Sequence, residues 1–337
     1  MMNCFRSARQ LCIIQLVWLA FLIPLTAIEA RAAESNGSTV QDPTLRILDR
    51  ASAFFNSGKG DSAMVYYNRA AKLSERQKDT RAKQLEVKAL LGKWSVYFFY
   101  FFDYSKAFEA LAQARLISEQ QAFSTAPVDF REGLLYHALS DQCNDEAAAR
   151  LALNNYQRAF AESGSDTEPQ TLNNMMVNYI LIAHKLGRLS SVRKMWGKYE
   201  KLLGKEKSGY YQFNKLLLEG MTAQNRRQYR KALQSYRHIF DVIPFRPDKY
   251  RNITLVYRFM ASSYAEMNIY GKAITMMERA LALADKGGMK DAQIEIYKIL
   301  ATYYGHAGRS QESTACLSRG VAISDSLLNY QQLAKVH

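Results

Sequence analysis

The segments YRKALQSYRHI, residues 229–239, and YGKAITMMERA, residues 270–280, share one arrangement of small and large side chains. In each segment an alanine is followed four positions later by a large residue, Tyr236 or Met277, and seven positions later by another small or apolar residue. Spacings of four and seven place these side chains on one face of an α-helix. The two segments are therefore predicted to be copies of one helical unit.

The same arrangement recurs along the chain. A marker residue, small in six of the seven copies, stands at positions 63, 107, 152, 192, 232, 273 and 313, so successive markers lie 40 to 45 residues apart. Twelve positions before two of these markers lies another small residue, Gly220 or Ala261. The third copy, around Ala152, is the least regular. Internal repeats of this length, with only six prolines in the chain, predict an all-helical repeat protein.

These residues resemble the tetratricopeptide repeat, in which small residues lie where two antiparallel helices cross and large residues fill the space between neighbours. The resemblance implies an all-α fold, a right-handed α-solenoid of about seven helix-turn-helix repeats over residues 43–330, followed by a short tail at 331–337. The spacing exceeds the usual period of about 34 residues. It is similar to the long repeats in the periplasmic sensor regions of bacterial sensor kinases and regulators.

The N-terminus has the features of an export signal. Arg6 and Arg9 precede an apolar stretch at residues 11–28, and Ala30 and Ala32 fit the small-x-small pattern of a signal peptidase site. We expect residues 1–32 to be a cleaved signal peptide and 33–42 a flexible segment. An uncleaved N-terminal anchor is the alternative. The mature chain is then expected, without a membrane span, in the periplasm of a Gram-negative cell envelope.

Charge and cysteine content narrow the partners and the covalent structure. The formal net charge of +14 favours anionic envelope surfaces or acidic partners, and we expect no nucleic acid because an exported protein rarely meets it. Cys143 and Cys316 could form a disulfide or remain thiols. Repeats in a solenoid contact only their neighbours, so these distant cysteines are not expected to be bridged. Cys143 is expected to be exposed.

The sequence lacks the patterns that catalysis and metal binding require. No two of the five histidines are spaced to share one helix face as ligands, and there is no HExxH, GxSxG or glycine-rich phosphate loop. We therefore expect no enzyme activity, no catalytic residue, no metal and no cofactor.

The resemblance also implies where a partner binds. In the tetratricopeptide family the first helix of each repeat lines a groove, and its outward side chains contact a protein or peptide ligand. Transferred onto this chain, that register includes Ser262 and predicts a peptide-binding groove formed by Phe99, Tyr100, Asn174, Asn178, His184, Asn214, Met221, Gln224, Asn225, Arg258, Glu266, Lys298 and His306.

An aromatic run, WSVYFFYFFDY at residues 94–104, lies in the second copy. The repeat register places Trp94, Phe98 and Phe101 between helices, as core. Phe99 and Tyr100, with Phe102 as a third candidate, fall outside that face. They are either buried by neighbouring repeats or exposed as an apolar binding patch.

The sequence thus predicts an exported module for protein or peptide interaction. It is interpreted as the periplasmic sensing portion of a signal-transduction protein, and the alternative is a free-standing periplasmic scaffold or assembly factor for envelope proteins. The sequence leaves the ligand and the oligomeric state open.

Overall fold

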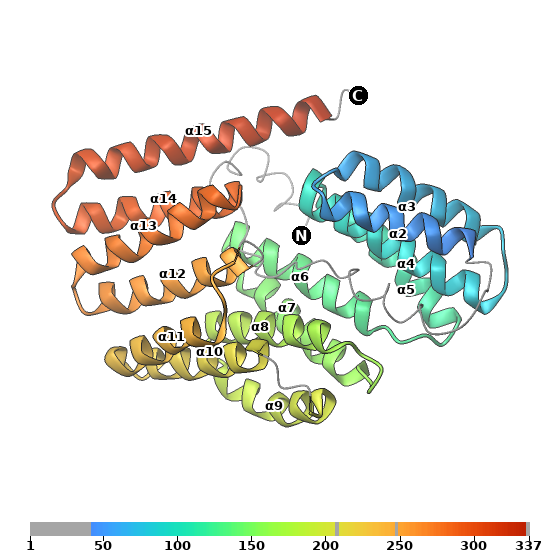
Figure 1. Ribbon diagram of the computed structural model, residues 1–337, viewed down its shortest axis with the longest axis horizontal. Coiled ribbons are helices and arrows are strands. Elements are labelled where there is room, and N and C mark those ends of the chain that lie inside the picture. The colour runs from blue at the N-terminus through green and yellow to red at the C-terminus, as the bar shows by residue number, and fades with distance from the viewer. Residues whose placement is uncertain (1–41, 206–208, 247–248, 335–337) are drawn as a thin grey trace. The chain divides into compact units, whose positions relative to one another are not determined.

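The computed structural model describes residues 42–205, 209–246 and 249–334 (Figure 1). The predicted signal peptide, all but the last residue of the segment 33–42 and the final residues of the tail lie outside this range. The described chain is helical and contains no strand. Its helices are α2 (Pro43–Asn56), α3 (Gly60–Glu75), α4 (Thr80–Val96), η1 (Tyr97–Phe101), α5 (Tyr104–Gln120), α6 (Ala126–Cys143), α7 (Glu146–Glu162), α8 (Pro169–Lys185), α9 (Leu189–Leu203), α10 (Gly209–Asn225), α11 (Tyr229–Val242), α12 (Tyr250–Glu266), α13 (Tyr270–Lys286), α14 (Lys290–His306) and α15 (Ser310–Ala334).

The α-helices follow one another as seven pairs, each a first helix with an even number and a second helix with an odd number. Every marker residue lies near the start of a second helix. Six of the seven markers are completely buried, and Ser313 is partly buried. Small side chains at these points let two helices approach closely, which explains the repeated spacing. The predicted all-α repeat architecture is confirmed, and the irregular third copy forms the pair α6 and α7 like the others.

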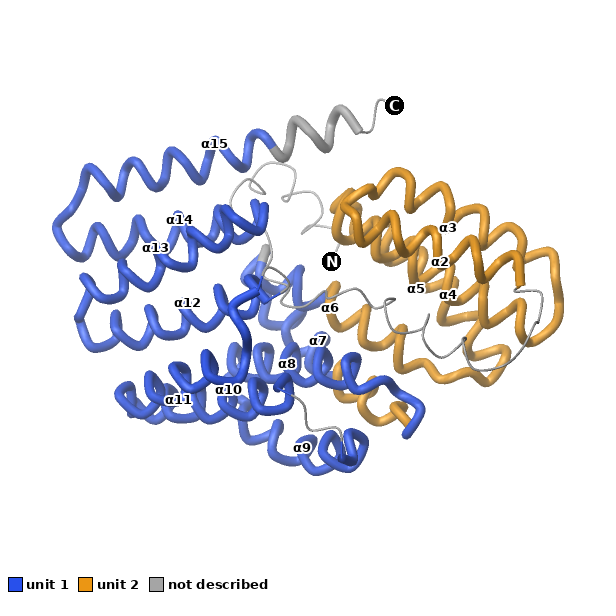
Figure 2. Tube along the Cα trace, in the orientation of Figure 1, with its two compact units in different colours: residues 1–21, 136–154, 165–337 blue, residues 22–135, 155–164 orange. Residues whose placement is uncertain are grey.

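The helices divide into two compact units (Figure 2). Among the described residues, unit 1 comprises 136–154 and 165–334, and unit 2 comprises 42–135 and 155–164. The boundary runs through α6 and α7, so each of these helices contributes to both units. Unit 1 contains the whole of α8 to α15, and unit 2 contains the whole of α2 to α5.

Local side chains set where several helices begin. The carboxylate of Asp42 accepts a hydrogen bond from the backbone N–H of Thr44 at 2.8 Å, at the start of α2. Asp79 and Asp103 act in the same way at α4 and α5. These carboxylates satisfy N–H groups that have no partner within the helix. Asp145 caps α7, because its carboxylate accepts hydrogen bonds from the backbone N–H groups of Ala147 and Ala148.

A π-helical turn, η1, extends the first helix of the second repeat through the aromatic run. Together α4 and η1 cover Thr80–Phe101, which explains why the first two markers are 44 rather than 40 residues apart. The turn ends at Phe102, whose backbone is left-handed with φ of 50°. Asp103 then starts the second helix.

The aromatic run packs within unit 2. Trp94 and Phe98 are buried and stack with their ring centroids 4.9 Å apart, as predicted. Phe99 and Tyr100 are partly buried and both lie against Phe55 of α2. The Tyr100 hydroxyl also donates a 2.6 Å hydrogen bond to the Phe55 carbonyl.

Two further rings of this run are partly buried. Phe101 packs against the core cluster formed by α2, α3 and α4, in agreement with its expected place between helices, and Phe102 is partly buried. None of the rings in residues 94–104 is among the large apolar side chains that are exposed. The run is therefore part of the packing of the first two repeats rather than an exposed patch.

Two further sequence predictions can be compared with the described chain. Cys143 is exposed and Cys316 is buried, and neither is in a disulfide, as expected. No described helix combines the length and the apolar character that crossing a bilayer requires.

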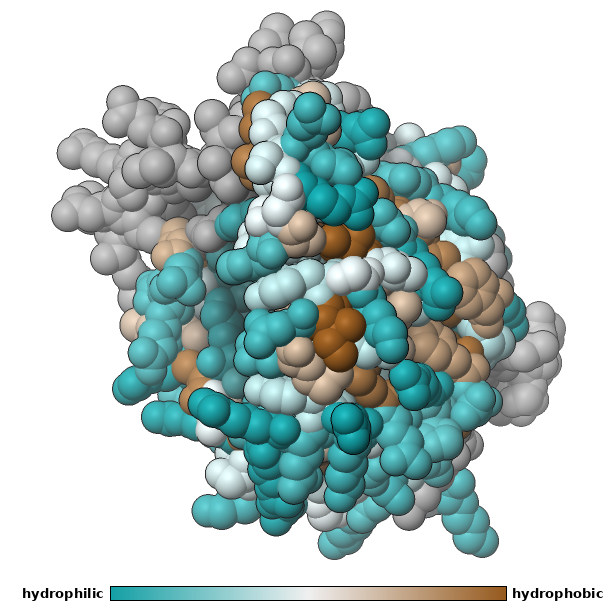
Figure 3. Space-filling model, turned by 90° about the vertical axis from the view of Figure 1, so that its left-hand side faces the viewer, coloured by the Kyte–Doolittle hydropathy of each residue, from teal (hydrophilic) through white to brown (hydrophobic). Residues whose placement is uncertain are grey.

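The side of the molecule shown in Figure 3 has small apolar areas separated by hydrophilic surface.

Candidate functional site

Four of the predicted groove residues lie in the core of unit 1. Asn174, Asn178, Asn214 and Met221 are each at most 1% exposed. They were expected to face a ligand, and their burial corrects that expectation. The reason is that the first helices of successive repeats pack against one another, so part of the face assigned to the groove is covered by the next repeat.

Asn214 shows how such a side chain is used. Its Nδ2 donates hydrogen bonds to the Asn173 carbonyl oxygen and to the Tyr199 hydroxyl, both at 3.1 Å. The Tyr199 hydroxyl in turn donates to Asn173 Oδ1 at 2.6 Å. Burial raises the pKa of Tyr199. The three side chains connect α8, α9 and α10, so Asn214 holds two repeats together.

Other predicted residues reach the surface. Gln224 is partly buried, and its Nε2 donates to the Ser262 hydroxyl at 3.0 Å, which links α10 to α12. Its Oε1 accepts a 2.9 Å hydrogen bond from the Tyr236 hydroxyl. Gln224 is therefore held in a fixed orientation by its own repeat and by the next one.

Arg258, another predicted groove residue, is a partly buried charged side chain of α12. Its side chain is 19% exposed, and its Nη2 lies 3.5 Å from the Glu295 carboxylate on α14. Burial lowers the pKa of Arg258 to about 10, although the negative charges of Glu295 and Asp141 act in the opposite direction. Because a pKa of about 10 lies well above 7, the guanidinium remains charged at neutral pH.

A second charged group joins α6 to α8. Lys185 Nζ donates to the Asp141 carboxylate at 2.5 Å and to the Ser140 carbonyl oxygen at 2.9 Å. His137 Nε2 lies 3.9 Å from the same carboxylate. Burial lowers the pKa of His137, and the charge of Lys185 lowers it further, whereas Asp141 raises it.

His184 lies on α8, six residues after Asn178. Its ring packs edge-on against Phe259 of α12, with centroids 5.8 Å apart. Burial lowers the pKa of His184. Its Nδ1 is buried and has no hydrogen-bond partner among the described residues. The neutral ring thus serves mainly as packing between α8 and α12.

Of the remaining predicted residues of unit 1, Asn225, Glu266 and His306 end their first helices, and Lys298 lies in the middle of α14. Glu266 is exposed and accepts a 3.3 Å hydrogen bond from the Tyr229 hydroxyl. His306 is exposed and stacks on Tyr270, with centroids 5.0 Å apart. Asn225 is exposed and Lys298 is partly buried.

We define the first-helix face of unit 1 as the predicted groove residues of α10, α12 and α14 that reach the surface, together with Ser262 and Glu295, which contact two of them. It consists of Gln224, Asn225, Arg258, Ser262, Glu266, Glu295, Lys298 and His306. Phe99 and Tyr100, predicted for the same groove, belong to unit 2 and are used there in packing.

Contacts between residues about one repeat apart were not predicted from the sequence. Arg251 Nη1 lies 2.8 Å from the Asp291 carboxylate, and these residues are 40 positions apart. The Gln224–Ser262 and Arg258–Glu295 contacts have separations of 38 and 37. A search for opposite charges at the repeat period could have found both ion pairs.

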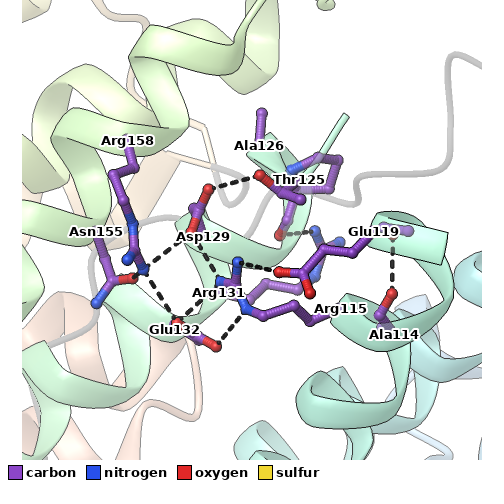
Figure 4. Close-up of polar contacts among 12 residues, drawn as sticks. Ala114, Arg115, Glu119, Thr125, Ala126, Asp129, Arg131, Glu132, Asn155 and Arg158 are labelled. Carbon is purple, nitrogen blue, oxygen red and sulfur yellow. Dashed lines mark hydrogen bonds and ion pairs between the residues drawn. The ribbon is translucent and has the colours of Figure 1, made fainter. Parts of the chain in front are cut away.

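Unit 2 contains a larger polar network, between α5, α6 and α7 (Figure 4). The Asp129 carboxylate is 2% exposed and lies 2.8 Å from Arg115 Nη2 and 3.1 Å from Arg158 Nη2. It also accepts a 3.0 Å hydrogen bond from Thr125. Glu132 pairs with the same two arginines. Asp129 and Glu132 of α6 each pair with both Arg115 of α5 and Arg158 of α7, so this network ties three helices together.

Unit 2 also has one open hollow of about 440 Å³. All six residues that line it come from α3 or its C-terminal end, and three of them, Arg69, Lys72 and Arg76, are basic. It is a shallow basic surface on a single helix. Neither this hollow nor the rest of the described chain contains three His, Cys, Asp or Glu residues grouped to hold a metal ion.

Comparison with known proteins identifies the architecture. No family model and no curated protein sequence matches the chain. Among solved structures, a tetratricopeptide repeat protein from Parabacteroides merdae is 13% identical with a TM-score of 0.54, covering 86% of this chain and 98% of that chain. The chain has the tetratricopeptide repeat fold. At this identity the likeness concerns the fold alone.

Two other similar structures have this fold. RapI, in its apo form, gives a TM-score of 0.58 at 12% identity and covers 85% of this chain and 99% of RapI. NprR, in complex with its cognate peptide NprX, gives a TM-score of 0.57 at 12% identity and covers 86% of this chain and 81% of NprR. The tetratricopeptide architecture thus extends over most of the chain.

Proposed function

We propose that this chain is a protein- or peptide-interaction module whose ligand binds the first-helix face of unit 1. The observation that carries the proposal is the place of Arg258: its side chain is 19% exposed and charged, and its Nη2 lies 3.5 Å from the Glu295 carboxylate on the neighbouring first helix. A carboxylate or a backbone carbonyl of a ligand can accept a hydrogen bond from this guanidinium, and a hydrogen bond from a charged donor is stronger than one between neutral groups. The structure of NprR with its cognate peptide and that of a Rap protein with competence and sporulation factor support a binding role for this fold.

The neighbouring side chains suit a peptide. Gln224 and Ser262 present amide and hydroxyl groups that can pair with a peptide backbone, and both are already oriented by the contact between them. Such orientation reduces the conformational entropy lost when a ligand binds. Glu266 and Lys298 add opposite charges on the same face. We therefore propose an extended peptide with at least one acidic group, held by Arg258.

Selection from a displayed random-peptide library, followed by calorimetric titration, tests this function. The selected peptides should bind the Arg258→Gln variant at least about tenfold more weakly, because a hydrogen bond to a charged group contributes about 1.5–3 kcal/mol. Arg230→Gln, which removes an exposed charge from α11, is the matched control and should leave binding unchanged. Equal affinity for all three proteins would place the ligand elsewhere, and a selection that enriches no peptide would contradict the proposal.

We further propose that the chain is exported to the periplasm after cleavage near residue 32. The support is the sequence of residues 1–32, which lie outside the described structure. Alkaline phosphatase, fused after residue 60, should be active in Gram-negative cells, since this enzyme matures only in an oxidising compartment. Mass spectrometry of the purified protein should give the N-terminus. A fusion that is inactive, while a fusion to a known signal peptide is active, would contradict export.

We propose that this module has a sensing role within the cell envelope. The alternative is that it is a free-standing scaffold or an assembly factor for envelope proteins. The support for sensing is the resemblance of the long repeats to sensor regions. The two roles differ in what the gene encodes after residue 337. A spanning segment followed by a kinase or DNA-binding domain would support sensing, whereas an immediate stop codon would favour the scaffold.

A further inference from the structure

Burial of one register position differs between the last repeat and the others. The position lies four residues after each marker, on the second helix. In five repeats this side chain is at most 5% exposed, and in the fourth it is partly buried. In the seventh repeat it is 52% exposed. The residues, in chain order, are Tyr67, Leu111, Tyr156, Trp196, Tyr236, Met277 and Leu317.

The first helix of the following repeat accounts for part of this burial. The ring of Tyr236 stacks on Phe259 of α12, with centroids 5.8 Å apart. Trp196 of α9 similarly contacts Tyr211 of α10, at 5.7 Å. No described helix follows α15, so Leu317 lacks this cover. The register thus indicates which kind of surface fits here: the apolar face of another helix.

Leu317 does not stand alone. Val321, one turn further along α15, is 46% exposed. Of the large apolar side chains that are exposed in the described chain, these are the two that share one helix face at a spacing of four. We call Leu317 and Val321 the α15 face. On the same helix Cys316 is buried, and Gly320 lies against Tyr297 of α14.

The first described helix, α2, has a different kind of exposed surface. The exposed side chains of α2 include Arg46, Asp49 and Arg50. A polar outer face on a terminal repeat keeps a solenoid soluble without a partner. Head-to-tail assembly would place this charged surface of α2 on the α15 face of another copy. Because it would bury those charges against Leu317 and Val321, α2 is not the helix that fits.

We propose that the α15 face binds the α15 face of a second copy of this chain, with the two helices antiparallel. A twofold axis then places Leu317 of one copy over Val321 of the other, and the same contact forms twice. The helix is long enough to make such a pair, because α15 has 25 residues whereas the other α-helices have 14 to 18. At 1.5 Å per residue it is about 37 Å long. Two such helices bury less area than a standard interface, so the dimer is concentration-dependent.

Sedimentation equilibrium of the mature chain, from about 1 µM to about 1 mM, tests the proposal over the affinity range of small interfaces. The expected result is a monomer–dimer equilibrium that the Leu317→Glu/Val321→Glu variant shifts fully to monomer. Val65→Glu is the matched control, since Val65 is 64% exposed on α3 and has no place in the proposed contact. It should dimerise like the unmodified chain. A chain that stays monomeric throughout, or a double variant that still dimerises, would overturn the proposal.

Disulfide cross-linking tests the orientation of the helices. In a Cys143→Ser background, one preparation carries Leu317→Cys and another carries Val321→Cys. Antiparallel pairing predicts that mild oxidation of the mixture gives more disulfide-linked dimer than either preparation alone, because residue 317 faces residue 321. Cross-linking that is equal in all three samples would contradict this arrangement.

Discussion

Three glycines lie in close contact with a tyrosine ring. Each contact is possible because glycine has no Cβ atom. A methyl group added to Gly92, Gly133 or Gly220 would lie 2.2 to 2.5 Å from the ring of a tyrosine on a second helix. Real carbon atoms do not approach so closely, so these positions exclude any other residue without movement of the ring. The glycines are required by packing, since all three lie within regular helices.

Gly220→Ala should therefore destabilise the protein by about 1–3 kcal/mol, the usual cost of overpacking. The added methyl group meets the Tyr236 ring at 2.3 Å, and that ring is completely buried. Gly197→Ala is the control, because Gly197 is also within a helix but has nothing within 4 Å of a new methyl group. It should stabilise α9 by about 0.5–1 kcal/mol. Urea unfolding measures both, and equal effects would show that the contact is not limiting.

The asparagine network of α8 and α10 gives a second prediction for single residues. Asn214→Ala removes the two buried hydrogen bonds that Nδ2 donates to the Asn173 carbonyl and the Tyr199 hydroxyl, and should lower the free energy of unfolding by about 1–3 kcal/mol. Asn225→Ala, on the exposed end of the same helix, should change it by less than about 0.5 kcal/mol. Urea unfolding distinguishes the two. A loss at Asn225 as large as that at Asn214 would contradict the structural role assigned to Asn214.

At the scale of elements, helix ends in this chain rely on left-handed residues. Gly187 ends α8 with φ of 66°, whereas Ala122 ends α5 with φ of 52°. After each, a backbone N–H closes the end of the helix: Arg188 on the Ala183 carbonyl, and Phe123 on the Ser118 carbonyl. The geometry is the same, but only glycine adopts it without strain.

Exchanging these residues should have opposite effects. Ala122→Gly should raise the free energy of unfolding by about 1 kcal/mol, because a left-handed L-residue costs about 1–2 kcal/mol and part of that gain is lost to chain entropy. Gly187→Ala should lower it by a similar amount, since no neighbour lies within 4 Å to add a packing effect. Thermal unfolding of the two variants measures the difference. Changes of the same sign would contradict this account.

At the scale of the whole molecule, buried histidines should make stability depend on pH. Burial lowers the pKa of His137 and His184 below the value of about 6.5 expected in the unfolded chain. The unfolded state therefore binds more protons as pH falls through this value, and the free energy of unfolding decreases below about pH 6.5. Lys185 strengthens this effect at His137, and Asp141 opposes it.

Urea midpoints at about pH 7.5 and about pH 5.5 test this dependence. The midpoint should fall on acidification, and His184→Gln should reduce the fall because it removes one buried titrating group. His306→Gln, at an exposed position, is the control and should retain the fall of the unmodified chain. A midpoint that rises on acidification would mean that the buried histidines do not set the pH dependence of stability.

The sequence predicted the repeats well because their pattern is local. Marker residues such as Ala63 and Ala273 recur at the helical period, and each is completely buried where two helices cross. The π-helical turn η1 was not predicted. Its residues are all aromatic, so the pattern of apolar residues looks the same for a π-helical turn as for an α-helical one. The Asp129 network was also missed, because its partners lie on three different helices.

The sequence by itself determined that this chain is a row of helical pairs, since spacing of small and large residues within 40 positions specifies each pair and its neighbour. Only the tertiary structure decided which polar residues of the first helices can meet a ligand. Asn214 and Gln224 both lie on α10 and were predicted alike, yet Asn214 is buried and Gln224 reaches the surface. The reason is that burial at these positions depends on side chains up to one repeat away, such as Asn173 and Ser262.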